Sequence, residues 1–172
     1  MEFAINRRDL FKSFAAAGAL LQLEAAQPGA PLFFTKEEFK MLDTLTELIV
    51  PADEHSPGAH EAGVAGYIDK ATAEAFLAED KVTWKNGLAA LNELARTEHR
   101  AHFSQIGHDK QLALLTKIAR AEDDPKTAAE KFFTQLKQTT AALYYSSSIG
   151  IHKEIEYKGN VLLKEFVGQE AV

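Results

Sequence analysis

The sequence contains no cysteine among its 172 residues. This absence excludes disulfide bonds, thiolate-bound zinc, cysteine-ligated iron–sulfur clusters, covalent haem attachment through Cys-x-x-Cys-His and a cysteine nucleophile. It does not place the protein in the cytosol, because an exported protein can also lack disulfides. Any chemistry at a site of this chain would have to come from other residue types.

Positive charge is also scarce. Lys and Arg number 19 against 25 Asp and Glu, so the formal net charge is −6, and no long basic run is present. Such a chain binds nucleic acids and anionic membranes poorly, and we expect no nucleic-acid partner. Nucleotide-binding loops, the nucleophile elbow and the His-Glu-x-x-His motif are missing as well. We therefore expect no catalytic residue, no cofactor and no metal in this chain.

Residues 1–27 have the layout of an export signal. A charged segment is followed by an uncharged stretch of 11 residues (13–23), and a membrane-spanning helix would need about 20. The residues of the signal are Arg7, Arg8, Leu10, Phe11 and Lys12. Paired arginines before a short apolar stretch are typical of the twin-arginine route, which exports folded proteins. The other interpretation is an amphipathic helix with an incidental arginine pair.

The export interpretation predicts a periplasmic protein that the twin-arginine translocase recognises. Membrane association would follow from an uncleaved leader or from a complex with a membrane-bound partner. Export of a folded chain is useful when a cofactor must be loaded in the cytoplasm, yet this chain shows no cofactor motif. The leader therefore points to a partner that carries the cofactor.

A linker is expected at residues 28–34 and a helical domain at 35–172. Thr35 and Glu38 form a capping-box pattern, and apolar residues at spacings of three and four follow until Pro51, which ends the helix. Further helices are expected at 61–77, at 80–103, from an Asp109 cap and from an Asp124 cap with Pro125. The sequence predicts an all-α fold, a bundle of about five helices with an irregular C-terminal tail, preceded by the export signal.

The same periodicity predicts which side chains face the core. They are Val64, Tyr67, Ile68 and Ala71 in the second helix, Trp84, Leu88, Leu91 and Ala95 in the third, Leu112, Leu115 and Ile118 in the fourth, and Phe132, Leu136, Thr140 and Leu143 in the fifth.

Few residues suggest chemistry of their own. His99 and His102 are three apart and could share a metal on one helix face, but no carboxylate completes the set, so a solvated helix end is favoured. The acidic pair Asp53–Glu54 and the acidic run at 122–124 lie where turns and helix starts are expected, which favours a structural role over acid–base catalysis.

Two segments are candidates for a partner interface because they combine rigid or aromatic residues with small ones. Their residues are Pro51, Pro57, Gly58, Tyr144, Tyr145 and Gly150. Tyrosine suits an interface because one end is apolar and the other forms hydrogen bonds. An equally good interpretation of the tyrosine pair is that one ring lies in the core and the other is exposed.

Two sequence patterns resemble a known family. The first combines Leu42-x-x-Leu45-x-x-Leu48-Ile49-Val50-Pro51-Ala52-Asp53 with Ser56-Pro57-Gly58-Ala59-x-x-Ala62-Gly63-Val64-x-x-Tyr67-Ile68-Asp69; the second combines Phe132 and Leu136-Lys137 with Tyr144-Tyr145-Ser146-Ser147-Ser148-Ile149-Gly150. Together they resemble the gluconate 2-dehydrogenase subunit 3 family over about residues 35–168. A twin-arginine leader on so small a subunit also fits that family.

The resemblance implies a small, non-catalytic subunit of a periplasmic or membrane-associated dehydrogenase. It further implies a large flavoprotein partner that holds FAD and oxidises sugars, sugar acids or other alcohols, and a cytochrome subunit that takes the electrons. The small subunit would supply the export signal for, and stabilise, the large one. The alternative is a free-standing exported helical protein that binds a metal or ligand through its histidines.

Overall fold

The computed structural model describes residues 30–157. The predicted export signal at 1–27 and most of the predicted tail lie outside this range. Within it the chain is helical and contains no strand, which confirms the all-α prediction. The elements are α2 (Lys36–Ile49), α3 (Val64–Glu74), α4 (Ala78–His99), a short 3-10 turn (Phe103–Gln105), α5 (His108–Ala119), α6 (Ala128–Ser146) and a π-helical turn (Gly150–Glu154). None of these helices is both long and apolar enough to span a bilayer.

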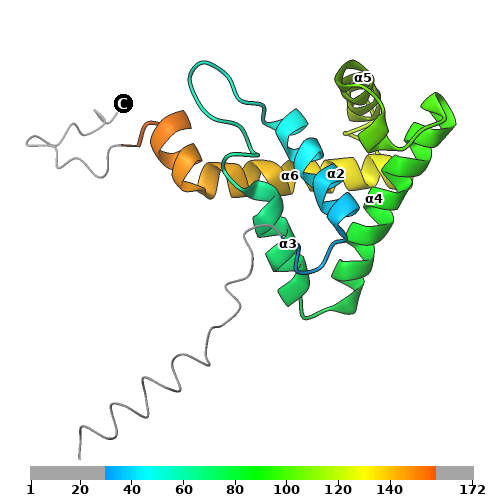
Figure 1. Cartoon of the computed structure of the whole chain (residues 1–172), viewed down its shortest axis with the longest axis horizontal. Coiled ribbons are helices and arrows are strands. Elements are labelled where there is room, and N and C mark those ends of the chain that lie inside the picture. The colour runs from blue at the N-terminus through cyan, green and yellow to red at the C-terminus, as the bar shows by residue number, and fades with distance from the viewer. Residues whose placement is uncertain (1–29, 158–172) are drawn as a thin grey trace, which may run out of the picture. The chain divides into compact units, whose positions relative to one another are not determined.

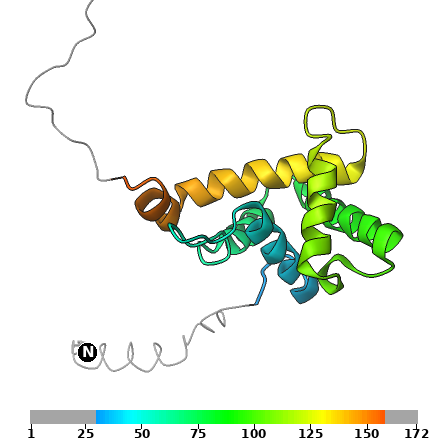
Figure 2. The ribbon, with the colours of Figure 1, turned by 90° about the horizontal axis from the view of Figure 1, so that it is seen from above.

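Helix α6 is the central element of the domain. It contacts α2, α3, α4 and α5, and it continues into the π-helical turn. Figure 1 shows α2 and α3 crossing α6 towards one end and α4 towards the other. Figure 2 shows the other helices gathered along one side of α6, so that its opposite side stays uncovered.

The core lies between α6 and the helices packed on it. Trp84 of α4 meets Phe132 of α6 edge to face, with ring centroids 5.5 Å apart, a geometry that aromatic quadrupoles favour. Gly87 lies beside the same ring, and a Cβ added there would come within 1.9 Å of Phe132 Cδ2. The two helices therefore approach each other as closely as they do because position 87 has no side chain.

Most of the expected inward residues are buried, but Tyr67, Ala71 and Leu112 are exposed. In α3 the buried face includes Asp69, which is only 3% exposed, and it turns Tyr67 outwards so that its side chain is 55% exposed. An apolar-only periodicity cannot anticipate this rotation, because it assigns a carboxylate to the surface.

Asp69 holds the segment that precedes α2. Its carboxylate accepts hydrogen bonds from the backbone N–H groups of Leu32, Phe33 and Phe34. The N···O distances from Phe33 and Phe34 are both 3.0 Å. A buried charge is tolerated only when it is paired or fully hydrogen-bonded, and three N–H donors meet that need. Residues 32–34 are thus part of the folded body, whereas the sequence assigned them to a linker.

The first helix begins as predicted. The Thr35 hydroxyl accepts from the Glu38 N–H, and the Glu38 carboxylate accepts from the Thr35 N–H. Partial burial works to raise the pKa of Glu38, but hydrogen bonds from Lys85 and Thr35 outweigh it and hold that pKa below its ordinary value. The Lys85 ammonium also lies 5.1 Å from the centre of the Phe33 ring, which ties α4 to the segment held by Asp69.

Three predicted helix starts are wrong. Helix α3 begins at Val64 rather than at 61, because Gly63 adopts a left-handed conformation (φ 70°) that interrupts the helix. Helix α6 begins not at Asp124–Pro125 but after Thr127, whose hydroxyl accepts from the Glu130 N–H while Glu130 accepts from the Thr127 N–H. A reciprocal capping box satisfies two N–H groups and therefore outcompetes a single aspartate. Helix α5 is preceded by Gly107 without a side-chain cap, so Asp109 lies in its first turn.

Candidate partner-binding site

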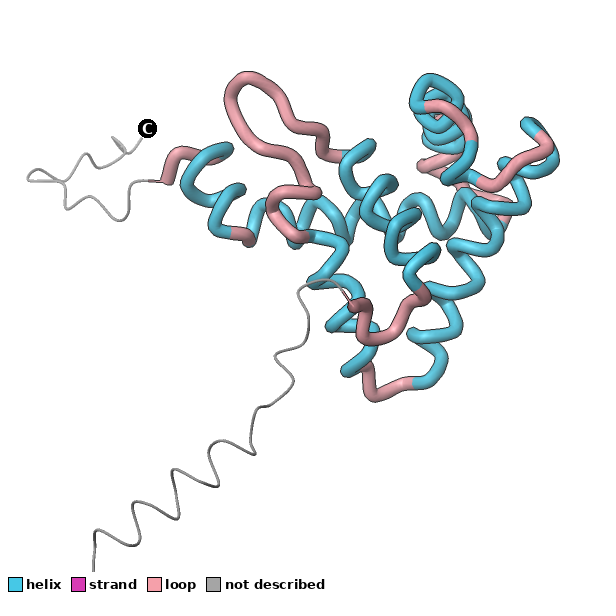
Figure 3. The backbone as a smooth tube through the Cα atoms, in the orientation of Figure 1, coloured by secondary structure: helices cyan, strands magenta, loops and turns pink. Residues whose placement is uncertain are grey.

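The long loop between α2 and α3, drawn pink in Figure 3, carries the first of the two signature patterns. It closes at its base through a hydrogen bond from the Ala59 N–H to the Val50 carbonyl, 2.9 Å long. At its tip the Asp53 carboxylate accepts from the N–H groups of His55 and Ser56, each at 2.8 Å. These hydrogen bonds hold the pKa of Asp53 below its ordinary value, and the bond from the Ser56 N–H contributes most. The tip is therefore a defined turn.

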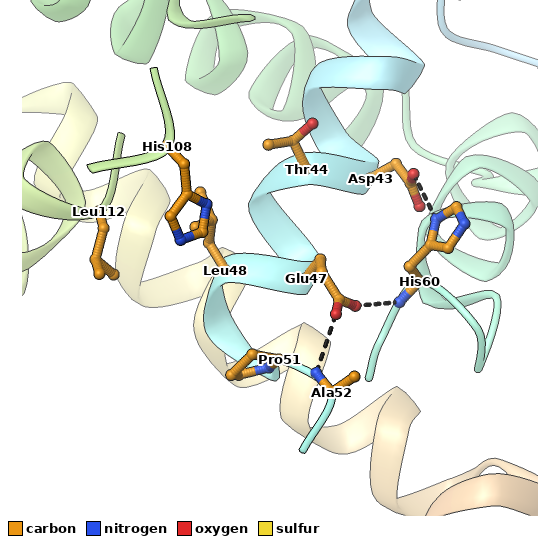
Figure 4. A pocket seen from close by; sticks show the side chains of 9 residues that line it. All are labelled: Asp43, Thr44, Glu47, Leu48, Pro51, Ala52, His60, His108 and Leu112. Carbon is orange, nitrogen blue, oxygen red and sulfur yellow. Dashed lines mark hydrogen bonds and ion pairs between the residues drawn. The ribbon is translucent and has the colours of Figure 1, made fainter. Parts of the chain in front are cut away.

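Glu47 braces the loop from α2 (Figure 4). One carboxylate oxygen accepts from the Ala52 N–H at 3.0 Å and the other accepts from the His60 N–H at 2.8 Å. Gly58 packs directly against this carboxylate, and a Cβ at that position would come within 2.4 Å of both oxygens. The glycine of the signature is thus needed for close packing on Glu47, a residue that no local sequence signal marks.

A pocket of about 390 Å³ lies beside this brace. Its carboxylates are already engaged, since Glu47 accepts two N–H groups and Asp43 lies 2.7 Å from the His60 ring nitrogen (Figure 4). His108 lies on the opposite wall with Leu112. Within the described part of the chain, no group of three or more His, Asp and Glu side chains could hold a metal ion. The pocket has an apolar floor and supplies no unengaged carboxylate.

Tyr144 joins the two signature patterns. Its hydroxyl donates to the Pro57 carbonyl at 2.7 Å and lies 2.8 Å from the Ser56 hydroxyl. The ring is 2% exposed, whereas that of Tyr145 is 46% exposed. This confirms the interpretation with one tyrosine in the core and one outside. The loop and the end of α6, about 90 residues apart in sequence, form one structural unit.

The backbone leaves the helical conformation of α6 at Ser147, which is extended, before the π-helical turn begins. The Ser147 hydroxyl donates to the Tyr144 carbonyl at 2.6 Å and accepts from the Gly150 N–H at 3.0 Å. Gly150 is buried there and begins the π-helical turn. Ser147 therefore ends α6 by bonding to its backbone, as hydroxyl side chains do at helix ends.

The six proposed interface residues divide into two groups. Pro51 and Tyr145 are exposed, while Gly58, Tyr144 and Gly150 are buried and Pro57 is half-buried. The buried members shape the loop from inside and are not open to a partner in the isolated domain. What this unit presents to solvent is the loop tip at 53–55, beside His152 and Lys153 of the π-helical turn, with which His55 lines a shallow depression.

The remaining chemical candidates do not converge. The Arg96 guanidinium lies 2.7 Å from the His102 ring nitrogen and donates to it, so this nitrogen is not directed at a metal shared with His99. Glu122 pairs with Lys137, and Asp124 pairs with Lys126. These carboxylates neutralise neighbouring cations at the surface.

Replacing Tyr144 with phenylalanine should lower the free energy of unfolding by about 1–2 kcal/mol, because the Ser56 hydroxyl and the Pro57 carbonyl lose their shared partner. Tyr145→Phe is the matched control and should change stability by less than about 0.5 kcal/mol. Urea unfolding of both variants measures the difference. If Tyr144→Phe unfolds at the same urea concentration as the unaltered domain, the hydroxyl of Tyr144 does not hold the loop.

Fold and loop together define a small all-helical domain in which the signature residues Ser56, Pro57 and Tyr144 brace one another. The chain belongs to the gluconate 2-dehydrogenase subunit 3 family, whose model matches residues 36–161. It is therefore a dehydrogenase-associated subunit of an oxidoreductase complex. No curated protein and no solved structure matches the chain.

Proposed function

We propose that this chain is a non-catalytic subunit that stabilises a large flavin-dependent dehydrogenase subunit and escorts it to the periplasm through the twin-arginine translocase. The observation that carries the proposal is the family match over residues 36–161. In the large subunit we expect FAD and the oxidation of a sugar, sugar acid or other alcohol, with a cytochrome subunit as electron acceptor.

Two features of the chain support this role. The Arg7–Arg8 pair precedes a short uncharged stretch, which is the address for export of a folded protein. The described body engages the signature residues Asp69 and Tyr144 in internal hydrogen bonds, and Glu47 braces the signature loop from α2. A body that folds around its own contacts is suited to carry the address while the partner carries the cofactor.

The escort role predicts that Arg7→Lys combined with Arg8→Lys leaves the large subunit in the cytoplasm. The double change keeps both charges but removes the paired guanidinium groups, which lysine does not replace. Cell fractionation with a dehydrogenase assay should show at least about a tenfold loss of periplasmic activity, while Arg120→Lys, a matched change on the exposed surface of the body, leaves it unchanged.

Deleting the whole chain gives the complementary result. The large subunit should stay in the cytoplasm or be degraded, and periplasmic dehydrogenase activity should disappear. If that subunit reaches the periplasm at its normal level without this chain, the escort proposal is wrong.

A further inference from the structure

A second surface, separate from the signature loop, lies where α3, α4 and α6 meet. Ala71 of α3 and Ala75, its C-cap, line a shallow groove together with Thr139 and Leu143 of α6. Trp84 of α4 contributes to the groove, and its side chain is otherwise buried. The short side chains at 71, 75 and 139 keep the groove open, because they leave the space between the two helices unfilled.

Charge is missing along this surface of α6. Residues 138–151 form a run without a single Asp, Glu, Lys or Arg, in a chain whose residues are 26% charged. Within α6, Gln138 and Ala142 are exposed and Thr139 is half-buried. An exposed helix that faces only water is normally rich in charged residues. The composition of α6 here is that of an interface, in which charged residues are depleted.

The α3–α4 turn, at the lower edge of the domain in Figure 1, gives this groove an apolar end. Phe76 is 98% exposed, and Leu77 and Val82 are each 54% exposed. Three large apolar side chains within seven residues on an otherwise polar surface mark an interaction site more often than a solvent-facing turn.

The same end of the groove is negatively charged. Glu74, Glu79 and Asp80 are exposed, and none of them forms an ion pair with another residue in the described range 30–157. The neighbouring Lys81 directs its ammonium to the Ala73 carbonyl at 2.9 Å. The acidic residues in the first turn of α4 interact favourably with the helix dipole. Within residues 30–157 no cation pairs with them, so they can pair with a cation of a partner.

We infer that this groove, which we call the α3–α6 groove, binds an amphipathic helix of the large dehydrogenase subunit. An apolar stripe of that helix would lie between Ala71 and Leu143 and cover Phe76 and Leu77, and a Lys or Arg at its end would pair with the acidic residues at 74–80. From Gln135 to Leu143 the groove follows α6 for about 12 Å, which matches two turns of a docked helix. The inference rests on the proposed function, because it names where that partner binds.

Affinity purification of the tagged full-length chain from the cells that produce it tests the groove. The readout is dehydrogenase activity retained with the chain, assayed with an artificial electron acceptor. Leu77→Asp, and separately Glu79→Lys combined with Asp80→Lys, should reduce the retained activity about tenfold or more, as loss of central interface contacts does.

Matched controls lie on α5. Ala113→Asp places the same charge on another exposed apolar residue, and Asp109→Lys reverses another first-turn acid. Both should retain the activity of the unaltered chain. Thermal unfolding should show that every variant stays folded, with only small falls in the midpoint for the charge reversals at 79, 80 and 109, because acidic residues in a first turn favour the helix dipole.

The outcomes separate the two proposals. If the groove variants retain full dehydrogenase activity, the α3–α6 groove is not the binding site, while the escort role can still hold. If the unaltered chain retains no dehydrogenase activity, both proposals are wrong. A photo-crosslinker at position 77 then identifies the occupant. Attachment to a helix of the large subunit supports the inference, whereas attachment to a second copy of this chain or to its own residues 1–29 overturns it.

Discussion

Replacing Asp69 with alanine is expected to lower the free energy of unfolding by about 3–5 kcal/mol, because three backbone N–H groups lose a charged acceptor and at least one stays buried without a partner. Such a loss is a large fraction of the total stability of a domain of this size. Urea unfolding measures the change, and limited proteolysis should then cut the chain near residues 32–34, which are no longer held.

Two further variants make the interpretation specific. Asp69→Asn keeps one carbonyl acceptor and should cost about half as much as alanine. Glu74→Ala removes an exposed carboxylate from the same helix and should change stability by less than about 0.5 kcal/mol. If Asp69→Ala unfolds at the same urea concentration as the unaltered domain, the segment before α2 is not anchored through this carboxylate.

The second large effect is expected at Gly87. Alanine there should destabilise the domain by about 2–3 kcal/mol, because its Cβ would overlap the Phe132 ring and force α4 away from α6. The sign of the stability change is informative, because replacing glycine with alanine would stabilise the helix by about 1 kcal/mol if the added Cβ met no other atom.

Gly66 in α3 supplies that control. A Cβ at this position meets no atom within 4 Å, so Gly66→Ala should raise stability by about 0.5–1 kcal/mol. Thermal unfolding of the pair should therefore show shifts of opposite sign. A stabilising effect at both positions would mean that α4 and α6 are further apart than the structure shows.

Local signals predicted local structure well. The capping box at Thr35 and the stripe formed by Trp84, Leu88 and Leu91 are properties of adjacent turns, and the structure confirms both. The errors arose where two signals competed. Asp124–Pro125 predicts a helix start, but Thr127–Glu130, three residues further on, provides a more complete cap.

Contacts between residues far apart in the chain could not be predicted from the sequence. Nothing local distinguishes Asp69 from a surface aspartate, because its three donors lie 35 to 37 residues away. In the same way, the glycine of the Ser-Pro-Gly-Ala pattern marks a turn, but its packing partner Glu47 lies in the preceding helix. Buried polar groups are recognised only when the backbone that satisfies them has been placed.

The candidate interface, too, could be predicted only in part. The sequence selected two segments, and the structure joins them through Tyr144 and Ser56. The sequence could not show which of the six candidate interface residues face outwards, and four of them are buried or half-buried in the structure. The α3–α6 groove could not be predicted because residues of three helices line it, and these residues come together only once the helices are packed.

The central claim is that this chain acts by binding a flavin-containing dehydrogenase subunit. Size-exclusion chromatography of the periplasmic fraction, followed by flavin absorbance and dehydrogenase activity across the eluate, tests it most directly. We expect this chain, the flavin and the dehydrogenase activity to elute together in one peak larger than either subunit alone. Elution of the chain by itself, with all flavin and dehydrogenase activity in fractions that lack it, would contradict the account.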